Sequence, residues 1–468
     1  MNRLEFLRLL GVSVAGYSLL GCQGSVAGNK KSTVKTDEQD EFAEFISKNR
    51  DLNVEIDKPV TVIVIGAGGR GNAYAGYAEK FPNTLNVIGV SDINEYRKNK
   101  MGDSFNIPAE HRFGDWSEVF TVPKFADAVI ISTPDNLHFE PCMKALEAGY
   151  DVLLEKPIAP TEEECKAILA QSKKYNKIVG VCHVLHYAPY FVALKQALES
   201  GIVGDIVSVQ HMEPILFDHM AHSYVRGNWH NSKETTPIIL AKSCHDLDII
   251  RWLVNQPCKS ISADGGVAFF RPENAPADAT ERCLDCPHEK QCAYSAVNIY
   301  VRRHRMLKVF DLPKVDDALI TEKLRTTNYG KCVFRMNNDQ CDHYVANMVF
   351  GTGITAAFSM EAFTSYSGRR TRIMGTKGDI VGDMTEFVAT DFLTHKKTRW
   401  NQPVEELEAY KGAGHGGGDW GLVRDFVLAV HHQDPTYLSS TVDDSVESHV
   451  MGFKAEESRL SDKKIQLS

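Results

Sequence analysis

A glycine-rich turn close to residue 66 could hold a dinucleotide. Gly66, Gly68 and Gly71 form the pattern G-x-G-x-x-G directly after the apolar run VTVIVI and before a helical stretch. The first glycine allows a tight turn, the second lets the backbone approach a pyrophosphate, and the third lets helix and strand pack closely. The phosphates would lie at the N-terminus of the helix, where backbone N–H groups point outward. We therefore expect this turn, including Gly69 and Arg70, to bind a dinucleotide cofactor.

An acidic residue suited to the adenosine ribose follows at the end of the next apolar run. Asp92 ends the stretch NVIGVSD. A carboxylate at this place accepts hydrogen bonds from the ribose hydroxyls and repels a 2′-phosphate, so the sequence favours NAD over NADP. Arg97 lies about one helical turn further on and would suit NADP, which therefore stays the alternative.

Short apolar strands alternate with amphipathic stretches around this turn. VTVIVIG, NVIGVSD, ADAVIIS, DVLLE and KIVGVC are rich in Val and Ile, and helical patterns separate them. This alternation predicts an α/β domain over residues 58–183, a Rossmann-type doubly wound parallel sheet. Residues 184–468 include strand candidates such as NMVFGTGITAAFSMEAF with few helices between them. They predict a C-terminal α+β domain with a mostly antiparallel open sheet, for substrate binding and oligomerisation.

Two proline-containing motifs resemble those of a known family. ISTPDNLHFEPCMKALEAGYDVLLEKPIAPTEEE, KIVGVCHVLHYAPYF and the late GTKGDIVG resemble the Gfo/Idh/MocA oxidoreductases, over most of the chain after residue 58. The resemblance implies that Lys156 is catalytic and that the bond before Pro157 is cis. A lysine at the carboxyl end of a strand can stabilise a developing alkoxide, although a structural ion pair is the alternative. The resemblance further implies that the nicotinamide-ribose end of the site is lined by Thr133, Pro134, Asn136 and His138, and Glu155 is a further candidate for cofactor binding.

The segment LAKSCHDLDIIRWL resembles the second catalytic element of the same family. In the family's sugar and polyol dehydrogenases an aspartate and a histidine lie one helical turn apart and face the substrate. His245 matches the histidine, but Ala241 occupies the aspartate position. We expect His245 to act as acid/base, with a hydrogen-bonded positioning or core histidine as the alternative. Lys242 is expected either to serve as a second catalytic cation or to form a salt bridge. Asp246 or Asp248 could partly replace the missing carboxylate.

Two further segments have the composition of a sugar-binding wall. HMAHSYVRGNWHN is dense in rings and hydrogen-bond donors, which suits the C–H face and the hydroxyls of a sugar. A locally packed loop is the alternative. GAGHGGGDWGLVRDF is a glycine-rich loop that is similar to a loop of related family members. The candidate substrate residues are Tyr187, His222, Tyr224, Arg226, Trp229, His230, His415 and Asp419.

The sequence ERCLDCPHEKQCAYS has metal-ligand spacing. Cys283, Cys286 and Cys292 could bind structural zinc together with a fourth ligand. In an exported protein the same residues could instead form a disulfide or stay reduced. The candidate fourth ligands are His288, His304, Cys258, Cys332 and Cys341.

The N-terminus has the features of an export signal. Basic residues precede the apolar run LLGVSVAGYSLLG, and SLLGC resembles a bacterial lipobox. Residues 1–21 are expected to be a signal peptide, Cys22 the lipidated residue and residues 22–57 a linker, which predicts a periplasmic or cell-envelope lipoprotein. An uncleaved anchor or a buried helix is the alternative. NRLEFLR is a degenerate twin-arginine pattern, so export after folding is an alternative to Sec export.

Composition and motifs together predict an enzyme. The net charge of -9 and the lack of a long basic run argue against nucleic acid as a partner. The leading hypothesis is an NAD-dependent oxidoreductase, expected to be a homo-oligomer, that acts on a ring hydroxyl or ketone of a sugar, glycoside or polyol. Since NAD is scarce outside the cytoplasm, such an enzyme should hold NAD tightly and recycle it in each turnover.

Two other functions remain open at this point. One is an NAD-dependent glycosidase similar to the α-N-acetylgalactosaminidases, in which transient oxidation permits elimination and Tyr187 or Tyr224 acts as base. The other is a non-catalytic sugar-binding lipoprotein with an unused cofactor pocket.

Overall fold

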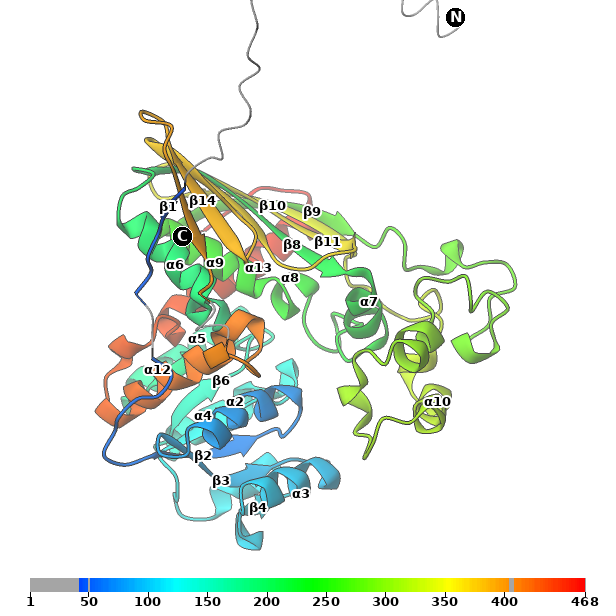
Figure 1. Ribbon diagram of the computed structural model, residues 1–468. Helices are drawn as coiled ribbons and strands as arrows, with labels where there is room; N and C mark the ends of the chain where they lie inside the picture. Colours follow the sequence, from blue (N-terminus) through cyan, green and yellow to red (C-terminus); the bar gives the residue numbers. More distant parts are fainter. Residues whose placement is uncertain (1–41, 49–50, 404–407, 468) are drawn as a thin grey trace, which may run out of the picture. The chain divides into compact units, whose positions relative to one another are not determined.

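Two β-sheets organise the folded part of the chain (Figure 1). The computed structural model describes residues 42–48, 51–403 and 408–467. The signal peptide and the lipidation site at Cys22 lie outside the described residues. Within the described ranges, no helix combines the length and the apolar character that crossing a bilayer requires.

The first sheet is parallel and has the strand order β4-β3-β2-β5-β6-β7. This is the order of a Rossmann sheet counted outward from β2, which confirms the predicted doubly wound domain. Its Val- and Ile-rich strands are buried because helices cover both faces. The strands are β2 (Val60–Ile65), β3 (Leu85–Ser91), β4 (Arg112–Phe113), β5 (Ala128–Ile131), β6 (Asp151–Leu154) and β7 (Val179–Val181), and the helices are α2 (Gly69–Lys80), α3 (Glu95–Ser104), α4 (Phe139–Glu147) and α5 (Glu162–Tyr175).

The second sheet has the strand order β1-β15-β14-β13-β12-β8-β11-β10-β9-β16. Its neighbouring strands are antiparallel except for the pairs β8–β11 and β1–β15, so the predicted mostly antiparallel sheet is confirmed. Its strands are β1 (Ala43–Glu44), β8 (Ile206–Leu216), β9 (Cys258–Gly266), β10 (His343–Phe350), β11 (Ile354–Thr364), β12 (Arg370–Gly375), β13 (Gly378–Gly382), β14 (Glu386–Asp391), β15 (Lys397–Asn401) and β16 (Ile465–Gln466).

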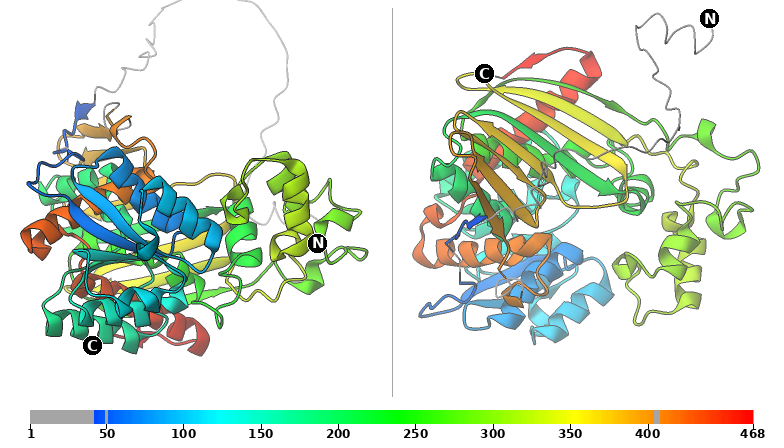
Figure 2. Two further views of the ribbon diagram at one scale, coloured as in Figure 1. Left: turned by 90° about the horizontal axis from the view of Figure 1, so that it is seen from below. Right: turned by 45° about the horizontal axis from the view of Figure 1, so that its top comes forward.

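Helices pack against one face of the second sheet. Buried and exposed residues alternate along β10, as expected for a strand with one face in the core. None of the helices among the described residues lies on the opposite face (Figure 2, right). The helices of this region are α6 (Pro189–Glu199), α7 (Phe217–His219), α8 (Ile238–Ala241), α9 (Cys244–Val254) and α13 (Val442–Ser461).

Two segments do not follow the predicted domain boundaries. Helix α12 (Gly418–His432) belongs to the part assigned to the C-terminal domain, yet Trp420 and Phe426 pack into the core of the Rossmann domain. The described part of the expected linker is also packed. Strand β1 pairs with β15, and Leu52 is buried in the Rossmann core, where its carbonyl accepts a hydrogen bond of 2.6 Å from the Tyr77 hydroxyl.

A long insertion separates β9 from β10. These two strands are paired neighbours, with His343 opposite Gly266, so a short turn would suffice to join them. Instead residues 267–342 form a group of short helices that includes α10 (Asp317–Thr326) and shares a hydrophobic core with the second sheet (Figure 1). The sequence predicted strands with few helices in this region, and the insertion corrects that expectation.

Candidate active site

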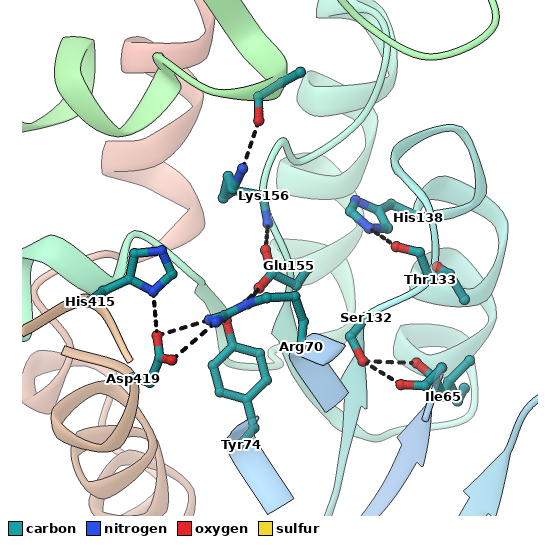
Figure 3. Close-up of polar contacts among 12 residues, drawn as sticks. Ile65, Arg70, Tyr74, Ser132, Thr133, His138, Glu155, Lys156, His415 and Asp419 are labelled. Carbon is teal, nitrogen blue, oxygen red and sulfur yellow. Dashed lines mark hydrogen bonds and ion pairs between the residues drawn. The ribbon is translucent and has the colours of Figure 1, made fainter. Parts of the chain in front are cut away.

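The glycine turn has the backbone geometry that a dinucleotide site requires. Gly66 has φ +93°, and a Cβ atom there would lie 2.7 Å from the backbone of Ser132. A Cβ atom at Gly71 would lie 2.1 Å from the carbonyl oxygen of Gly66, so α2 can approach β2 only with glycine at this position. Around Gly69 there is open space instead. The Ser132 hydroxyl donates to the Gly66 carbonyl at 2.8 Å and braces the turn (Figure 3).

Asp92 lies beside this turn, at the carboxyl end of β3. Its carboxylate accepts hydrogen bonds of 2.8 Å from the backbone N–H groups of Ala67 and Asn94. A cavity of about 500 Å³ adjoins the turn and is lined by Gly68, Gly69 and Arg97 among others. Its volume lies in the range of cofactor and ligand pockets. The turn, the carboxylate and the cavity therefore fit the adenosine half of NAD.

Arg70 connects three separate segments through ion pairs with buried carboxylates (Figure 3). Its guanidinium contacts Asp419 through two nitrogens at 2.9 and 3.0 Å and Glu155 at 2.5 Å, and Tyr74 donates to Glu155 at 2.6 Å. Burial alone would raise the pKa of both acids, but their polar neighbours lower it below the usual range. At Glu155 the largest lowering cause is the charge of Arg70, and at Asp419 it is the hydrogen bond from His415, followed by the charge of Arg70. These side chains bind one another and thereby fix each other's positions, and their contact with cofactor or substrate stays a prediction.

Lys156 follows Glu155 at the carboxyl end of β6, and its bond to Pro157 is cis, as the resemblance implied. The Lys156 ammonium donates a hydrogen bond of 2.7 Å to the carbonyl oxygen of Ala241 (Figure 3). The structural alternative was an ion pair between the Lys156 ammonium and a carboxylate, and the described contacts of the ammonium include none. The Glu155 carboxylate accepts a hydrogen bond from the backbone N–H of Lys156 instead.

His245 is buried at the start of α9, close to other titratable groups. Its Nδ1 atom has no hydrogen-bond partner within the described residues. Its ring lies 5.8 Å from that of His415, whose Nδ1 is held by Asp419 at 2.9 Å. Burial, followed by the nearby charge of Lys156, lowers the pKa of His245 well below its usual value. A neutral imidazole with a free nitrogen therefore lies in the electrostatic field of the Lys156 ammonium.

The residues expected to compensate for the missing aspartate have other partners. Lys242 forms a salt bridge of 3.1 Å with Glu213, which is the alternative that the sequence left open. Asp246 pairs with Arg369 at 2.8 Å. Asp248 contacts His186 at 2.6 Å and accepts a hydrogen bond of 3.0 Å from Ser448. Neither carboxylate is therefore available to replace the one absent at residue 241.

The Thr-Pro segment after β5 is held mainly by its own backbone. His138 is buried, with its two ring nitrogens 2.7 and 2.8 Å from the carbonyl oxygens of Pro157 and Thr133, so its predicted role in cofactor binding is corrected to a structural one. The Thr133 hydroxyl donates to the Leu137 carbonyl at 2.8 Å. Contact of the nicotinamide end with Thr133, Pro134 and Asn136 stays a prediction.

Asp135, between those residues, was not identified from the sequence. Its carboxylate accepts hydrogen bonds from the Trp229 indole at 2.9 Å and the Thr236 hydroxyl at 2.9 Å. It thereby ties the Rossmann domain to the predicted substrate wall. The sequence offered one signal for this role of Asp135, namely an acidic residue directly after the Thr-Pro dipeptide. That dipeptide follows β5 at the carboxyl edge of the sheet, where ligands and neighbouring segments meet in this fold.

Most of the ring-rich segment is used for packing. The His222 ring bonds the Tyr300 hydroxyl at 2.8 Å and stacks on Tyr329. The Arg226 guanidinium donates to the carbonyl oxygens of Lys331 and Tyr294 at 2.7 Å. These partners belong to the insertion, so His222 and Arg226 anchor it rather than form a sugar-binding wall.

His230 and the two candidate tyrosine bases are also placed in the interior. The His230 ring bonds the Gly227 carbonyl at 2.8 Å within its own turn. Tyr187 is buried, and its oxygen lies 2.8 Å from the Ser440 hydroxyl. Burial raises the pKa of both Tyr187 and Tyr224, which disfavours the phenolate that a base would need. The structure therefore gives no support to Tyr187 or Tyr224 as a base, and contact of Tyr187, Tyr224 and His230 with a substrate stays a prediction.

The cysteine cluster gathers around Arg226 without forming a metal site. Cys283, Cys286 and Cys292 line a small cavity of about 30 Å³ together with Cys332. The Cys283 sulfur accepts from Arg226 at 3.4 Å. Nowhere in the described ranges do three His, Cys, Asp or Glu side chains form a group that could hold a metal ion, and every cysteine of those ranges is a free thiol. The zinc prediction is not supported, and no disulfide joins these cysteines.

Comparison with known proteins defines the class. Residues 60–183 match the family model described as oxidoreductase family, NAD-binding Rossmann fold, and residues 195–458 match that of the oxidoreductase family, C-terminal alpha/beta domain. The second match alone covers more than half of the chain. The chain therefore belongs to the Gfo/Idh/MocA family and is an NAD-dependent oxidoreductase, as the sequence motifs indicated.

Curated relatives carry oxidoreductase names. YteT of Bacillus subtilis (strain 168), whose name classes it as an oxidoreductase, is 26% identical over 370 residues, which is 75% of this chain and 84% of YteT. The inositol 2-dehydrogenase/D-chiro-inositol 3-dehydrogenase of Lactiplantibacillus plantarum is 25% identical over 199 residues. That match covers 42% of this chain and 53% of the enzyme. The glycosidase alternative finds no support in these names.

Solved structures share the fold. An inositol dehydrogenase homologue from Azotobacter vinelandii, complexed with NADH and myo-inositol, is 15% identical with a TM-score of 0.62 over 89% of this chain and all of its own. An oxidoreductase from Agrobacterium radiobacter in complex with NAD+, L-tartaric acid and magnesium is also 15% identical, with a TM-score of 0.64 over 87% of this chain and 98% of its own. At such identities the likeness concerns the fold alone.

Proposed function

We propose that this oxidoreductase acts on a ring hydroxyl or ketone of a sugar, glycoside or polyol and keeps its NAD bound through each turnover. The observation that carries the proposal is the pair of Lys156 and His245, a cation and a neutral imidazole close enough for one to lower the pKa of the other. Such a pair suits proton transfer at a carbon that gains or loses hydride. The inositol dehydrogenases among the relatives support a polyol-like substrate.

Lys156 would orient the reacting oxygen. Bound NAD supplies the hydride acceptor or donor. An ammonium has three N–H groups, and one of those of Lys156 is used by the Ala241 carbonyl. The other two can donate to the substrate oxygen, and the positive charge stabilises an alkoxide as it develops.

His245 would exchange the proton. Its imidazole can accept the proton of a substrate hydroxyl and return it to a ketone oxygen. Because its pKa is lowered, the imidazole is neutral at neutral pH and ready to accept. The neighbouring His415, fixed by Asp419, would carry hydrogen bonds to other hydroxyls of the substrate.

Export and anchoring through Cys22 belong to the same proposal. They rest on the sequence MNRLEFLRLLGVSVAGYSLLGC. An exported enzyme without a NAD supply needs a closed cycle, in which one sugar reduces the cofactor and another oxidises it again. The helix-free face of the second sheet is where we expect a second copy to associate. Fractionation of cells that produce the chain, with Cys22→Ser as the comparison, tests the anchor.

The substrate is tested with protein purified without added nicotinamide. Mass spectrometry of the denatured protein should detect NAD or NADH. Addition of myo-inositol, aldoses or uronic acids should then generate the fluorescence of bound NADH, and a keto sugar should abolish it. Hydrolysis of aryl glycosides without net redox change would contradict the proposal, as would a bound cofactor that no sugar or polyol reduces.

A further inference from the structure

The insertion reaches the adenosine end of the cofactor site. Its short helix Leu307–Phe310 ends at Asp311, which has a left-handed backbone with φ +49°. The Asp311 carboxylate accepts hydrogen bonds from Arg97 at 2.9 Å and from the Asn94 side chain at 3.3 Å. The backbone N–H of Asn94 in turn donates to Asp92. The insertion is thus fastened directly beside the carboxylate that is expected to hold the ribose.

Lys308, in the same turn, lies over the start of α2. It lines the cavity of about 500 Å³ at the adenosine end. It also lines a neighbouring cavity of about 740 Å³ that includes Gly414 and Asp419. Both cavities share Gly69 and Asn72, the first turn of α2, where a pyrophosphate binds in this fold.

The charges around this place favour a phosphate ligand. Lys308 is exposed, and the described residues offer its ammonium no carboxylate partner. Lys100 lines the same cavity. Lys314 also lines it but lies 3.4 Å from Asp316, and Arg97 is paired with Asp311. Lys308 and Lys100 therefore bring lysine charge to the cavity beside the turn that the pyrophosphate would occupy, while Glu79 is a carboxylate that lines the neighbouring cavity. The arginine suited to a 2′-phosphate is already paired with a carboxylate.

We propose that the Leu307–Asp311 turn of the insertion is part of the cofactor site. Lys308 binds the pyrophosphate of NAD, and Asp311 latches the turn to α3 while it withholds Arg97 from a 2′-phosphate. Asp311 thereby makes the site specific for NAD, and the closed turn slows its release. This inference concerns the cofactor and holds whichever sugar or polyol is the substrate.

The pyrophosphate contact is tested by binding of ADP-ribose and NAD to the full chain stripped of cofactor. Lys308→Ala should weaken both ligands about tenfold and accelerate the dissociation of NAD, because a charge-assisted contact is lost. Lys290→Ala removes an exposed lysine elsewhere in the insertion and should change neither quantity. Lys308→Ala affinities within twofold of the wild type would overturn the assignment of Lys308.

The specificity role is tested with Asp311→Asn, and Glu273→Gln serves as the matched charge change on an exposed part of the insertion. Asp311→Asn should shift the ratio of NADP to NAD affinity about tenfold toward NADP, since Arg97 is released and a carboxylate removed. If the ratio of NADP to NAD affinity and the circular dichroism spectrum were both unchanged in Asp311→Asn, the specificity role of Asp311 would be overturned. A wild-type chain that binds neither ADP-ribose nor NAD would refute NAD dependence as a whole. Normal binding in every variant would refute only the role of the Leu307–Asp311 turn in the cofactor site.

Discussion

The carbonyl oxygen of Ala241 accepts a hydrogen bond of 2.7 Å from the ammonium of Lys156. Residue 241 is the position where the family resemblance leads one to expect an aspartate. Here a neutral backbone group holds the lysine in place of a carboxylate. The positive charge of Lys156 is therefore less compensated, and more of it is available to a developing alkoxide.

Lys156→Ala should lower kcat about a thousandfold, because both the hydrogen bond to the reacting oxygen and the stabilising charge are lost. ADP-ribose affinity should not change, since this ligand lacks the nicotinamide end. Reduction of bound NAD by the substrate, followed by fluorescence, measures the rate. Lys166→Ala removes an exposed lysine of α5 paired with Glu162 and is the control. Near-normal turnover in Lys156→Ala would refute its catalytic role.

The pH dependence should report the lowered pKa of His245. A base acts only above its pKa, and burial with the charge of Lys156 places that pKa below 6.5. Oxidation of substrate should therefore stay at its neutral-pH rate as the pH falls through 6.5 and decline only in more acidic solution. His245→Asn should lower kcat about a hundredfold and remove the acidic decline. A wild-type decline centred at or above pH 6.5 would contradict the neutral state that the buried site imposes.

Gly71→Ala should prevent NAD binding and destabilise the chain. The new Cβ atom would lie 2.1 Å from the Gly66 carbonyl, so α2 would have to move away from β2. Gly69→Ala is the control, because it makes the same substitution in the same helix, but its new Cβ atom would lie in open space. It should therefore leave the midpoint of thermal unfolding nearly unchanged. Thermal unfolding and NAD titration of both variants measure the difference. Equal behaviour of the two would show that the close approach at Gly71 is unnecessary.

Local motifs allowed much of this site to be predicted from the sequence. The glycine turn, Asp92 and Lys156 each follow a short apolar strand. A strand and the loop after it are formed by adjacent residues, so such a motif can be recognised locally. Parallel strands place their carboxyl ends along one edge, so these motifs had to meet. Local sequence also indicated both sheets. Strands separated by a helix tend to pair parallel, whereas strands joined by short connections tend to pair antiparallel.

Contacts between distant segments could not be predicted in this way. Arg70 and Asp419 are 349 positions apart and meet only because α12 packs on the Rossmann core. The rings of His222 and Tyr224 have the composition of a binding wall, but the same composition serves packing when an insertion covers them. Asp311 carried no motif at all. Its importance arises from the contact that it makes with Arg97.

The ion pairs of Arg70 should stabilise the fold and also position His415. Asp419 is almost fully buried whereas the Arg70 side chain is 32% exposed, so removal of the acid should cost about 3 kcal/mol, the low end for a broken buried pair. Urea unfolding of Asp419→Asn measures this loss. Asp443→Asn, which breaks a surface pair with Lys173, should change the free energy of unfolding by less than about 1 kcal/mol.

A double-mutant cycle separates the pair from its surroundings. Arg70→Met leaves both Glu155 and Asp419 buried without their cation, so it should destabilise more than Asp419→Asn. The double variant should be more stable than the sum of the two losses predicts, with a coupling of about 1 kcal/mol or more. Asp419→Asn should also raise KM, because the bond that fixes the His415 ring beside His245 loses its charged acceptor and is weakened. Additive stabilities together with an unchanged KM would mean that the cluster neither supports the fold as a unit nor orients the site.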